Sequence, residues 1–253
     1  MARLIAGEFE KVFSIRLWLW LLLGSAGLTA LYASLTIVNA DNPDTWVFPL
    51  STGAGQRTLF SVGQGAGSLV AVLGAIGLTS EFRHRTATAT FLATPRRSQV
   101  VTAKLVTFPL LGAAYGLVCV VVTVAVALPW LSAKGIDVSL VANGIPGTLA
   151  GVVAASALFG LVGVGVGALL RDQVGAVVVL LVYLFVAEPI LTRVEVFSAW
   201  TPYLPGPAAN ALTQVNLTNQ DFLAPWQGGL VLAGYGLALA LAGTRLTIRR
   251  DIA

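Results

Sequence analysis

The sequence contains few of the side chains on which most enzymes and metal sites depend. Its 253 residues include one cysteine, Cys119, and one histidine, His84. A single cysteine excludes an intrachain disulfide, and a cluster of Cys and His metal ligands is excluded as well. No His-Glu-x-x-His pair, Gly-x-Ser-x-Gly elbow or Gly-x-x-x-x-Gly-Lys-Ser/Thr phosphate loop occurs. The chain is therefore expected not to be an enzyme and to hold no cofactor, metal or ATP of its own.

Charge is also scarce. Only 10% of the residues are charged and 57% are hydrophobic, with a mean hydropathy of +0.85. A soluble domain carries about 25% charged residues, so these charges are too few to cover a water-soluble surface. The composition predicts an all-α integral membrane protein whose single permease domain covers residues 1–253. Cys119 lies in an apolar run, where a small residue facing a helix or lipid is the expected role.

Six apolar runs are long enough to cross a bilayer, which takes roughly 20 residues of helix. They cover residues 17–38, 58–79, 105–131, 146–170, 174–191 and 226–246. The runs are continuous rather than alternating, which favours helices over strands because a helix satisfies its own backbone in lipid. The first run exceeds the length of a signal-peptide core and is expected to be a retained anchor.

Lysine and arginine are distributed unevenly around these runs. With the N-terminus inside, the inner segments hold 12 of the 15 basic residues and the outer segments hold 3. This asymmetry predicts that both termini and the 80–104 loop are cytoplasmic. Basic residues at an inner membrane face also explain the net charge of +4 without nucleic acid. Arginine outnumbers lysine 12 to 3, which is typical of a GC-rich bacterium and favours a bacterial cytoplasmic membrane.

Two further segments are expected to be helical without crossing the membrane. Residues 1–16 mix apolar and charged side chains, which predicts an amphipathic helix at the interface. Residues 192–225 are rich in proline and aromatic residues, which predicts short re-entrant or interfacial helices at the outer face. Glycines also recur at a spacing of four, which favours close packing either inside the bundle or between subunits. The pairs are Gly63/Gly67, Gly112/Gly116, Gly147/Gly151 and Gly163/Gly167.

Glu188 is the ionisable residue expected to lie at membrane depth. A carboxylate there is costly, so one interpretation is contact with a substrate or a water-filled cavity. The other is that Glu188 is simply hydrated at the outer end of a short span. Tyr203 suits the aromatic belt of the outer interface, and together with Glu188 it is a candidate for the substrate path or outer gate.

The segment between the second and third runs carries a dense group of polar residues. Thr79 or Ser80 can cap a helix, and Glu81 then lies in its first turn, where negative charge is favoured. Pro95 would end or kink this helix, so a cytoplasmic helix over residues 80–95 is predicted. Its small side chains suit a groove on another protein. The alternative is a positively charged loop that only follows the inside rule.

The residues of this segment resemble the cytoplasmic loop of ABC-2 type permeases, the membrane subunits of type V ABC exporters. The matching stretches are Glu81-Phe-Arg-His-Arg-Thr86, Phe91-Leu-Ala-Thr-Pro95-Arg-Arg and then Lys104. The family pattern is a Glu, three residues, Gly-Thr, Thr-Pro-x-Arg and a Lys at the next span. Arg85 stands where the family often has glycine, so the start of the helix can differ.

The resemblance implies a coupling helix over residues 81–94 that docks on a separate ATP-binding cassette ATPase subunit, which would supply ATP and Mg²⁺. It further implies a second permease copy, expected to form a homodimer in membrane lipid, and ATP-driven export of a hydrophobic or amphipathic substrate. The residues expected to contact the ATPase are Glu81, Arg83, His84, Arg85, Thr86, Pro95 and Arg97.

Three alternatives remain open at this point. A secondary transporter or channel would need several buried ionisable residues and internal repeats, and neither is evident. A membrane enzyme would need clustered His, Asp or Glu, which the sequence lacks. A non-transporting regulatory subunit is compatible with the same loop.

Overall fold

The computed structural model describes residues 1–40, 48–83, 97–215 and 223–250, with the backbone alone for residues 97–98 and 246–250. Helices and their connections account for these residues, and no strand occurs in the described ranges. The elements are α1 (Ala2–Phe13), α2 (Leu17–Asn39), α3 (Gly53–Ser61), η1 (Val62–Gly65), α4 (Ala66–Arg83), α6 (Arg97–Ala133), α7 (Ile145–Leu170), α8 (Gln173–Val182), η2 (Tyr183–Ala187), α9 (Glu188–Leu191), η3 (Glu195–Phe197), η4 (Thr201–Tyr203), α10 (Pro205–Thr213) and α11 (Pro225–Arg250).

Six of these helical stretches are long and apolar enough to cross a membrane, which confirms the six predicted spans. Two are less regular than the sequence suggested. The second span joins α3 to α4 through the 3₁₀ turn η1, and the fifth contains the π-helical turn η2. Both irregularities alter the helical hydrogen-bond ladder, a feature often found at functional positions. The chain is thus a multi-pass helical membrane protein.

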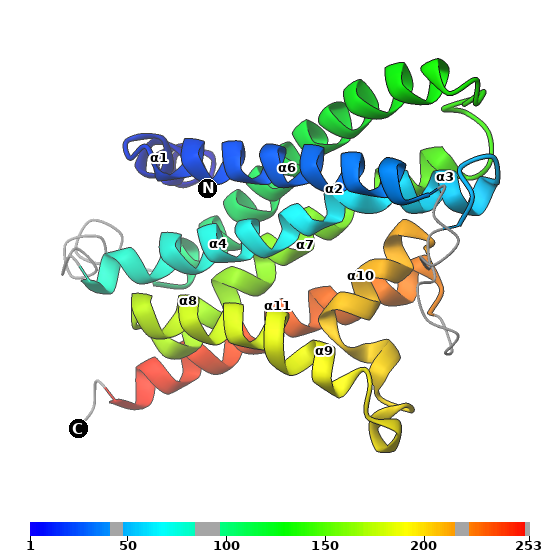
Figure 1. Ribbon diagram of the computed structural model, residues 1–253. Coiled ribbons are helices and arrows are strands. Elements are labelled where there is room, and N and C mark those ends of the chain that lie inside the picture. The colour runs from blue at the N-terminus through cyan, green and yellow to red at the C-terminus, as the bar shows by residue number, and fades with distance from the viewer. Residues whose placement is uncertain (41–47, 84–96, 216–222, 251–253) are drawn as a thin grey trace.

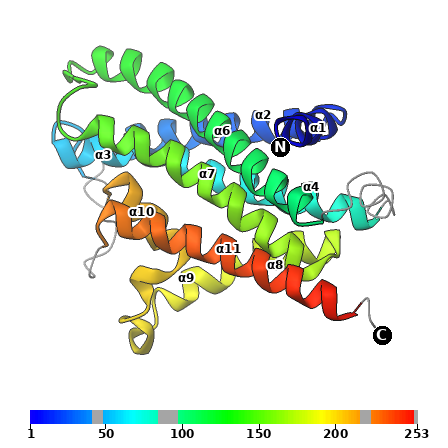
Figure 2. The same cartoon turned by 180° about the vertical axis from the view of Figure 1, so that it is seen from behind.

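Helix α7 forms the centre of the bundle and packs against α4, α6 and α11 (Figure 2). Its glycines allow neighbouring backbones to approach closely. A Cβ atom at Gly163 would collide with the carbonyl oxygen of Ala71 on α4, and one at Gly151 would collide with that of Leu212 on α10. Both glycines belong to the predicted small-residue pairs, so at these positions the pairs pack inside the bundle.

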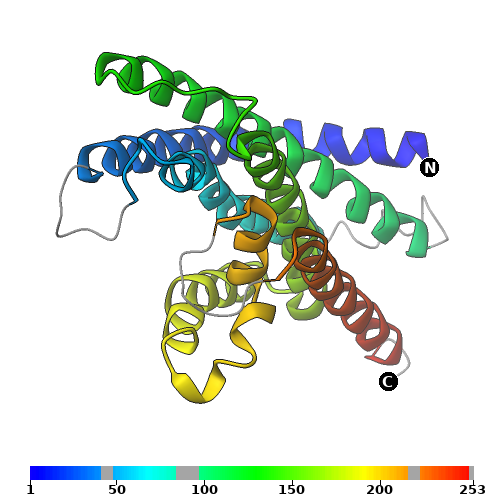
Figure 3. The same cartoon turned by 90° about the vertical axis from the view of Figure 1, so that its right-hand side faces the viewer.

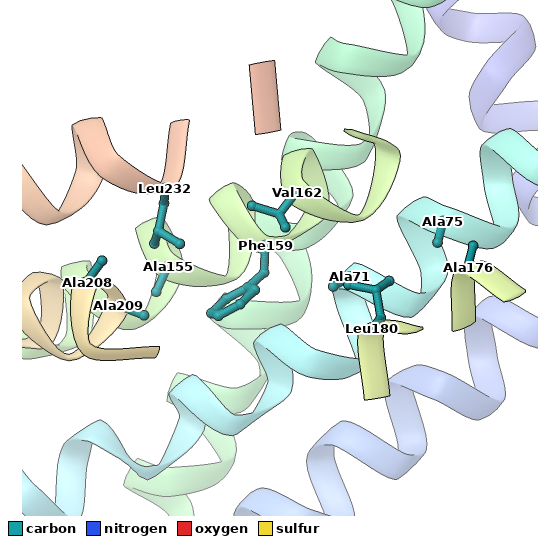
Figure 4. Close-up of a cluster of buried hydrophobic side chains, with 10 residues drawn as sticks. All are labelled: Ala71, Ala75, Ala155, Phe159, Val162, Ala176, Leu180, Ala208, Ala209 and Leu232. Atoms are coloured by element: carbon teal, nitrogen blue, oxygen red, sulfur yellow. The ribbon is translucent and has the colours of Figure 1, made fainter. Parts of the chain in front are cut away.

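The main apolar core joins α7 to α4, α8, α10 and α11 (Figure 4). Phe159, Leu180 and Leu232 are its bulkiest members. Alanines such as Ala71 and Ala155 fill the space between the helices. Small side chains let these helices lie close together, which is the main source of helix association in lipid. The spans containing α2 and α8 are the least enclosed, with 22% and 17% of their apolar 18-residue stretches buried inside the protein.

The first residue and the described end of α11 lie at the same end of the bundle (Figure 1). We call this the termini end, and it also holds α1, the last turn of α4 and the first turns of α6. The opposite end, called the distal end, holds residues 48–52 before α3, the loop after α6 and the turns η3 and η4 (Figure 1). Placing both termini at one end agrees with an even number of spans.

The start of the predicted loop helix differs from the structure. Helix α4 continues through Ser80 to Arg83, and the hydroxyl of Thr79 donates to the carbonyl of Ala75 within the same helix. Neither Thr79 nor Ser80 therefore caps a new helix, because α4 keeps its backbone hydrogen bonds through this turn. Helix α6 begins at Arg97, before the predicted start of the third span. The remainder of the predicted helix, residues 84–95, lies outside the described residues.

Candidate functional site

Four charged side chains from three helices meet at the termini end of the bundle. Glu8 and Lys11 lie three residues apart on α1, so they project from the same helix face. Glu81 belongs to the last turn of α4, and Lys104 lies two turns into α6. We call Glu8, Lys11, Glu81 and Lys104 the ion cluster.

Each carboxylate of the ion cluster contacts both lysines. Lys104 Nζ lies 2.5 Å from Glu8 Oε2 and 3.0 Å from Glu81 Oε1. Lys11 Nζ lies 2.7 Å from Glu8 Oε1 and 2.8 Å from Glu81 Oε1. Two positive and two negative groups thus form a closed ring with no net charge.

Three members of the ion cluster are almost completely buried. The exposed fractions are 1% for Lys104, 4% for Glu8 and 8% for Glu81. Ions removed from water in this way are stable only when they are paired and hydrogen-bonded. Burial by itself lowers the pKa of Lys11, but hydrogen bonds and negative charge from Glu8 and Glu81 outweigh it and raise that pKa above its ordinary value. Lys11 is therefore charged at neutral pH.

Packing around Lys104 helps to hold its ammonium group in place. Lys104 Nζ also donates to the carbonyl oxygen of Gly77 on α4, at 3.1 Å. Gly77 accommodates the ring of Phe108 from α6, because a Cβ atom at Gly77 would collide with that ring. Val12 of α1 joins the same apolar layer as Phe108. Polar and apolar contacts therefore fasten α1, α4 and α6 to one another.

Two members of the ion cluster flank the segment formed by residues 84–96, one on each side. Glu81 comes three residues before this segment, and Lys104 comes eight residues after it. Through the shared contacts, α1 is connected to the helix that enters the segment and to the helix that leaves it. A displacement of the end of α4 or of the start of α6 would therefore also displace α1.

The expected ATPase-contact residues fall into four groups. Glu81 is buried in the ion cluster, which differs from the exposed contact inferred from the sequence. Arg83 is exposed at the end of α4, and its Nη1 donates to Gln173 Oε1 of α8 at 3.3 Å. The structure describes only the backbone of Arg97, at the first residue of α6. The remaining residues, His84, Arg85, Thr86 and Pro95, lie outside the described residues.

A third buried carboxyl group, outside the ion cluster, lies at the distal end. Glu188 is 4% exposed, so the interpretation as a hydrated residue does not fit its position. Its Oε1 accepts a hydrogen bond from the backbone N–H of Gly206, in the first turn of α10, at 2.5 Å. Its Oε2 is buried and has no hydrogen-bond partner among the described residues. Tyr203 is 49% exposed in η4 and does not share this burial.

Sequence reasoning missed Glu8 and Lys11 as members of the site. The available signal was their spacing of three residues within an otherwise amphipathic helix, which is common on solvated helix faces. Only contacts between distant parts of the chain distinguish a buried pair from a surface pair. No group of three or more potential metal-ligating His, Cys, Asp or Glu side chains occurs in the described part of the chain.

The fold and its buried charges define a multi-pass α-helical membrane protein. No protein-family model matches the chain, and no curated protein matches it with significant similarity.

Proposed function

We propose that this chain is the permease subunit of an ATP-driven exporter of the ABC-2 type. The observation that carries the proposal is the ion cluster, which fastens α1 to both flanks of the segment that resembles a coupling helix. The match at Glu81, Thr86, Pro95, Arg97 and Lys104 gives the same segment its family resemblance. A permease needs this kind of mechanical connection, because its own chain carries no ATP site.

The proposed partner is an ATP-binding cassette subunit that holds ATP and Mg²⁺. In this assignment Arg83 and the segment after it provide the contact surface, together with His84, Arg85, Thr86, Pro95 and Arg97. Glu81 acts indirectly, because its carboxylate is buried between Lys11 and Lys104. Its role is to position the end of α4 beneath the contact surface.

Coupling requires that the two states of the ATPase contact this segment differently, since a partner with equal affinity for both states shifts nothing. Closure of the ATPase pair would push the segment and rotate the attached helices as rigid bodies. The neutral ion cluster would keep α1, α4 and α6 together during this motion. The energy of the ATPase would then reach the membrane through three helices.

The proposed location is the bacterial cytoplasmic membrane with both termini inside. The distribution of 12 inner against 3 outer basic residues supports this orientation. In the working assembly two permease copies would pair and α1 would lie at the inner interface. The weakly enclosed α2 and α8 spans would then face lipid or the second copy, and residues 192–225 would cover the outer end.

Co-purification tests this function with two exposed arginines at opposite ends of the bundle. Arg83 and Arg193 are both exposed, so Arg83→Glu and Arg193→Glu make the same charge change at the two ends. The permease is isolated from its native membrane, and the bound nucleotide hydrolase is identified by mass spectrometry from peptides containing a phosphate loop. We expect Arg83→Glu to reduce its recovery by about tenfold, corresponding to about 1.4 kcal/mol, while Arg193→Glu leaves it unchanged.

Equal recovery with both variants, or the absence of any nucleotide hydrolase at normal permease expression, would contradict the proposal. Purified permease reconstituted with the hydrolase should then transport only when ATP is supplied on the side of the termini. Transport by the permease alone would remove the motor from the mechanism.

One observation favours a second candidate function, that of a proton-coupled secondary transporter. The buried carboxyl of Glu188 has one oxygen without a partner among the described residues, and such residues within membrane helices often carry protons. This function predicts transport driven by a pH gradient in vesicles that contain the permease without an ATPase. Failure of a pH gradient to drive transport would leave the ATP-driven function as the explanation.

A further inference from the structure

A cavity of about 430 Å³ opens at membrane depth between α2, the second span and the turn η2. Figure 3 shows α2 and α8 on different sides of α4. Residues of α2 and of the turn η2, which follows α8, both line the cavity. Its volume falls in the range of about 300–1,000 Å³ that is usual for small-molecule sites. The cavity extends along α2 from Leu28 to Thr36, a rise of about 12 Å at 1.5 Å per residue.

The wall of the cavity is mainly apolar in surface and carries several uncharged polar groups. Eight of its fifteen lining residues carry a hydroxyl or amide group, and none of these described lining residues is charged. Phe159 and Phe185 contribute apolar surface to the same wall. A charged ligand would lose its hydration without meeting an opposite charge here, which is strongly unfavourable. An uncharged ligand with both apolar and hydrogen-bonding parts matches this wall.

Two amide side chains form the polar centre of the cavity. Gln64 Nε2 in η1 donates to Asn210 Oδ1 of α10 at 2.8 Å, and Gln64 Oε1 accepts from the Thr213 hydroxyl at 3.1 Å. The Nδ2 group of Asn210 makes no hydrogen bond with the described residues. Because Asn210 lines the cavity, a ligand carbonyl, ether or hydroxyl oxygen there can accept from its two N–H donors.

The hydroxyl groups of the wall supply acceptors that complement these donors. Ser61 and Thr36 each donate to a backbone carbonyl of their own helix, at 2.8 Å. Their oxygen lone pairs remain available to a donor from a ligand. The cavity can therefore accept and donate hydrogen bonds while its aromatic wall contacts an alkyl or ring system.

We propose that this cavity binds an uncharged amphiphile whose polar group is held by the Gln64–Asn210 amide pair. The assignment of this cavity as the binding site of the exported substrate rests on the proposed function. Binding of the amphiphile itself requires no ATPase. The amide pair joins the 3₁₀ turn of the second span to α10. An amphiphile in the cavity thus contacts both the spanning bundle and the helix at its distal end.

Two glycines allow a matched test that leaves the fold intact. Gly65 lines the cavity, whereas Gly27 lies on α2 and does not line it. A Cβ atom at either position meets no heavy atom of another residue within 4 Å, and both glycines are exposed. Gly65→Leu therefore begins its side chain in open space at the cavity, and Gly27→Leu adds the same side chain at an equally open position away from it.

The probes are two diazirine-labelled amphiphiles with identical alkyl chains, one with a glucoside headgroup and one with a trimethylammonium headgroup. Purified permease in lipid nanodiscs is irradiated without ATPase, and labelled peptides are quantified by mass spectrometry. Labelling of the cavity wall at residues 28–36 and 184–185 is normalised to labelling of residues 230–241, which include exposed leucines of α11. This normalisation corrects for the different partitioning of the probes into lipid.

We expect the glucoside probe to label the cavity wall about tenfold more than the cationic probe, and Gly65→Leu to remove about nine-tenths of that labelling. Gly27→Leu should leave it unchanged. Asn210→Leu, which removes the amide at similar size, should lower it by about threefold to tenfold. Equal labelling by both probes, or equal effects of the two glycine variants, would overturn the proposed site. Loss of ATPase co-purification with intact labelling would overturn the proposed function alone.

Discussion

The two buried carboxylate sites, at opposite ends of the bundle, differ in how completely they are compensated. At the termini end, Glu8 and Glu81 share two lysines and form a neutral ring. At the distal end, Glu188 receives one backbone hydrogen bond from Gly206, and its second oxygen has no partner among the described residues.

The difference indicates two kinds of mechanical connection. A paired cluster is difficult to open, because removing any member leaves a buried charge without its counter-charge. A single carboxyl with one hydrogen bond can be replaced by a neutral group of the same shape with little loss. The termini end is therefore suited to transmit force without separating, whereas the contact between Glu188 and α10 is suited to open.

Removal of Lys104 should produce the largest effect in this comparison. In Lys104→Met, Glu8 and Glu81 share Lys11 alone while remaining buried, and we expect a loss of about 3–5 kcal/mol in the free energy of unfolding. Denaturant titration of the purified permease in mixed micelles measures it. Lys134→Met is the matched control, because Lys134 is exposed and donates to the backbone carbonyl of Ile37; its expected loss is about 1 kcal/mol. Similar losses for both variants would show that the ion cluster contributes little.

The same glutamate-to-glutamine change should affect the stability of the two sites differently. Glu81→Gln leaves the buried Lys104 with one carboxylate instead of two, whereas Glu188→Gln keeps an oxygen for the Gly206 N–H and removes no paired charge. We expect the first variant to lose about 2 kcal/mol more unfolding free energy than the second. Unfolding titrations of both variants beside the parent protein measure the difference. A larger loss for Glu188→Gln would mean that Glu188 is a paired anion in the native state.

A methyl group at Gly206 should disturb the distal contact alone. A Cβ atom there would collide with Glu188 Oε1, so Gly206→Ala should lower the unfolding free energy by about 1–3 kcal/mol. In a Glu188→Ala background the collision is absent and the effect should disappear, which thermal unfolding of the four proteins measures. Gly229→Ala on α11 is the control, because its Cβ would make an ordinary contact with Leu212. If the losses of Gly206→Ala and Glu188→Ala simply add in the double variant, the strain at Gly206 does not come from the Glu188 carboxylate.

The smallest expected effect concerns pH. The pKa of Lys11 is raised in the folded protein, so its contribution to stability is complete below its unfolded pKa of about 10.4 and disappears only as the pH rises through the higher folded value. The difference in unfolding free energy between the parent protein and Lys11→Met should therefore stay constant from about pH 6 to pH 9. A decrease of this difference within that interval would show that Lys11 is not held as a cation.

Much of the fold was predictable because lipid imposes a simple rule on the chain. Long uncharged runs such as Leu17–Asn39 and Ile145–Leu170 must form helices, since their backbone groups find no partner in hydrocarbon. Local deviations were not predictable in this way. The 3₁₀ turn at Val62–Gly65 and the π turn at Tyr183–Ala187 depend on neighbouring helices. The continuation of α4 past Ser80 was also missed, because a serine can cap a helix or donate within it.

The candidate site was predictable only in part. Lys104 and Glu81 were singled out by their positions around the charged segment, but their partners on α1 were not. Glu8 and Lys11 resemble a surface pair until α1 packs against α6. The cavity around Gln64 and Asn210 depends in the same way on contact between residues 146 positions apart.

By itself the sequence determined that the chain crosses the membrane in six helices, because twenty apolar residues in a row leave the backbone no other stable arrangement in lipid. Tertiary structure alone decided which charges are buried together and which helices they join. Opposite charges separated by 96 positions, such as Glu8 and Lys104, are paired by the packing of the helices that carry them, and that packing depends on the shapes of many side chains at once.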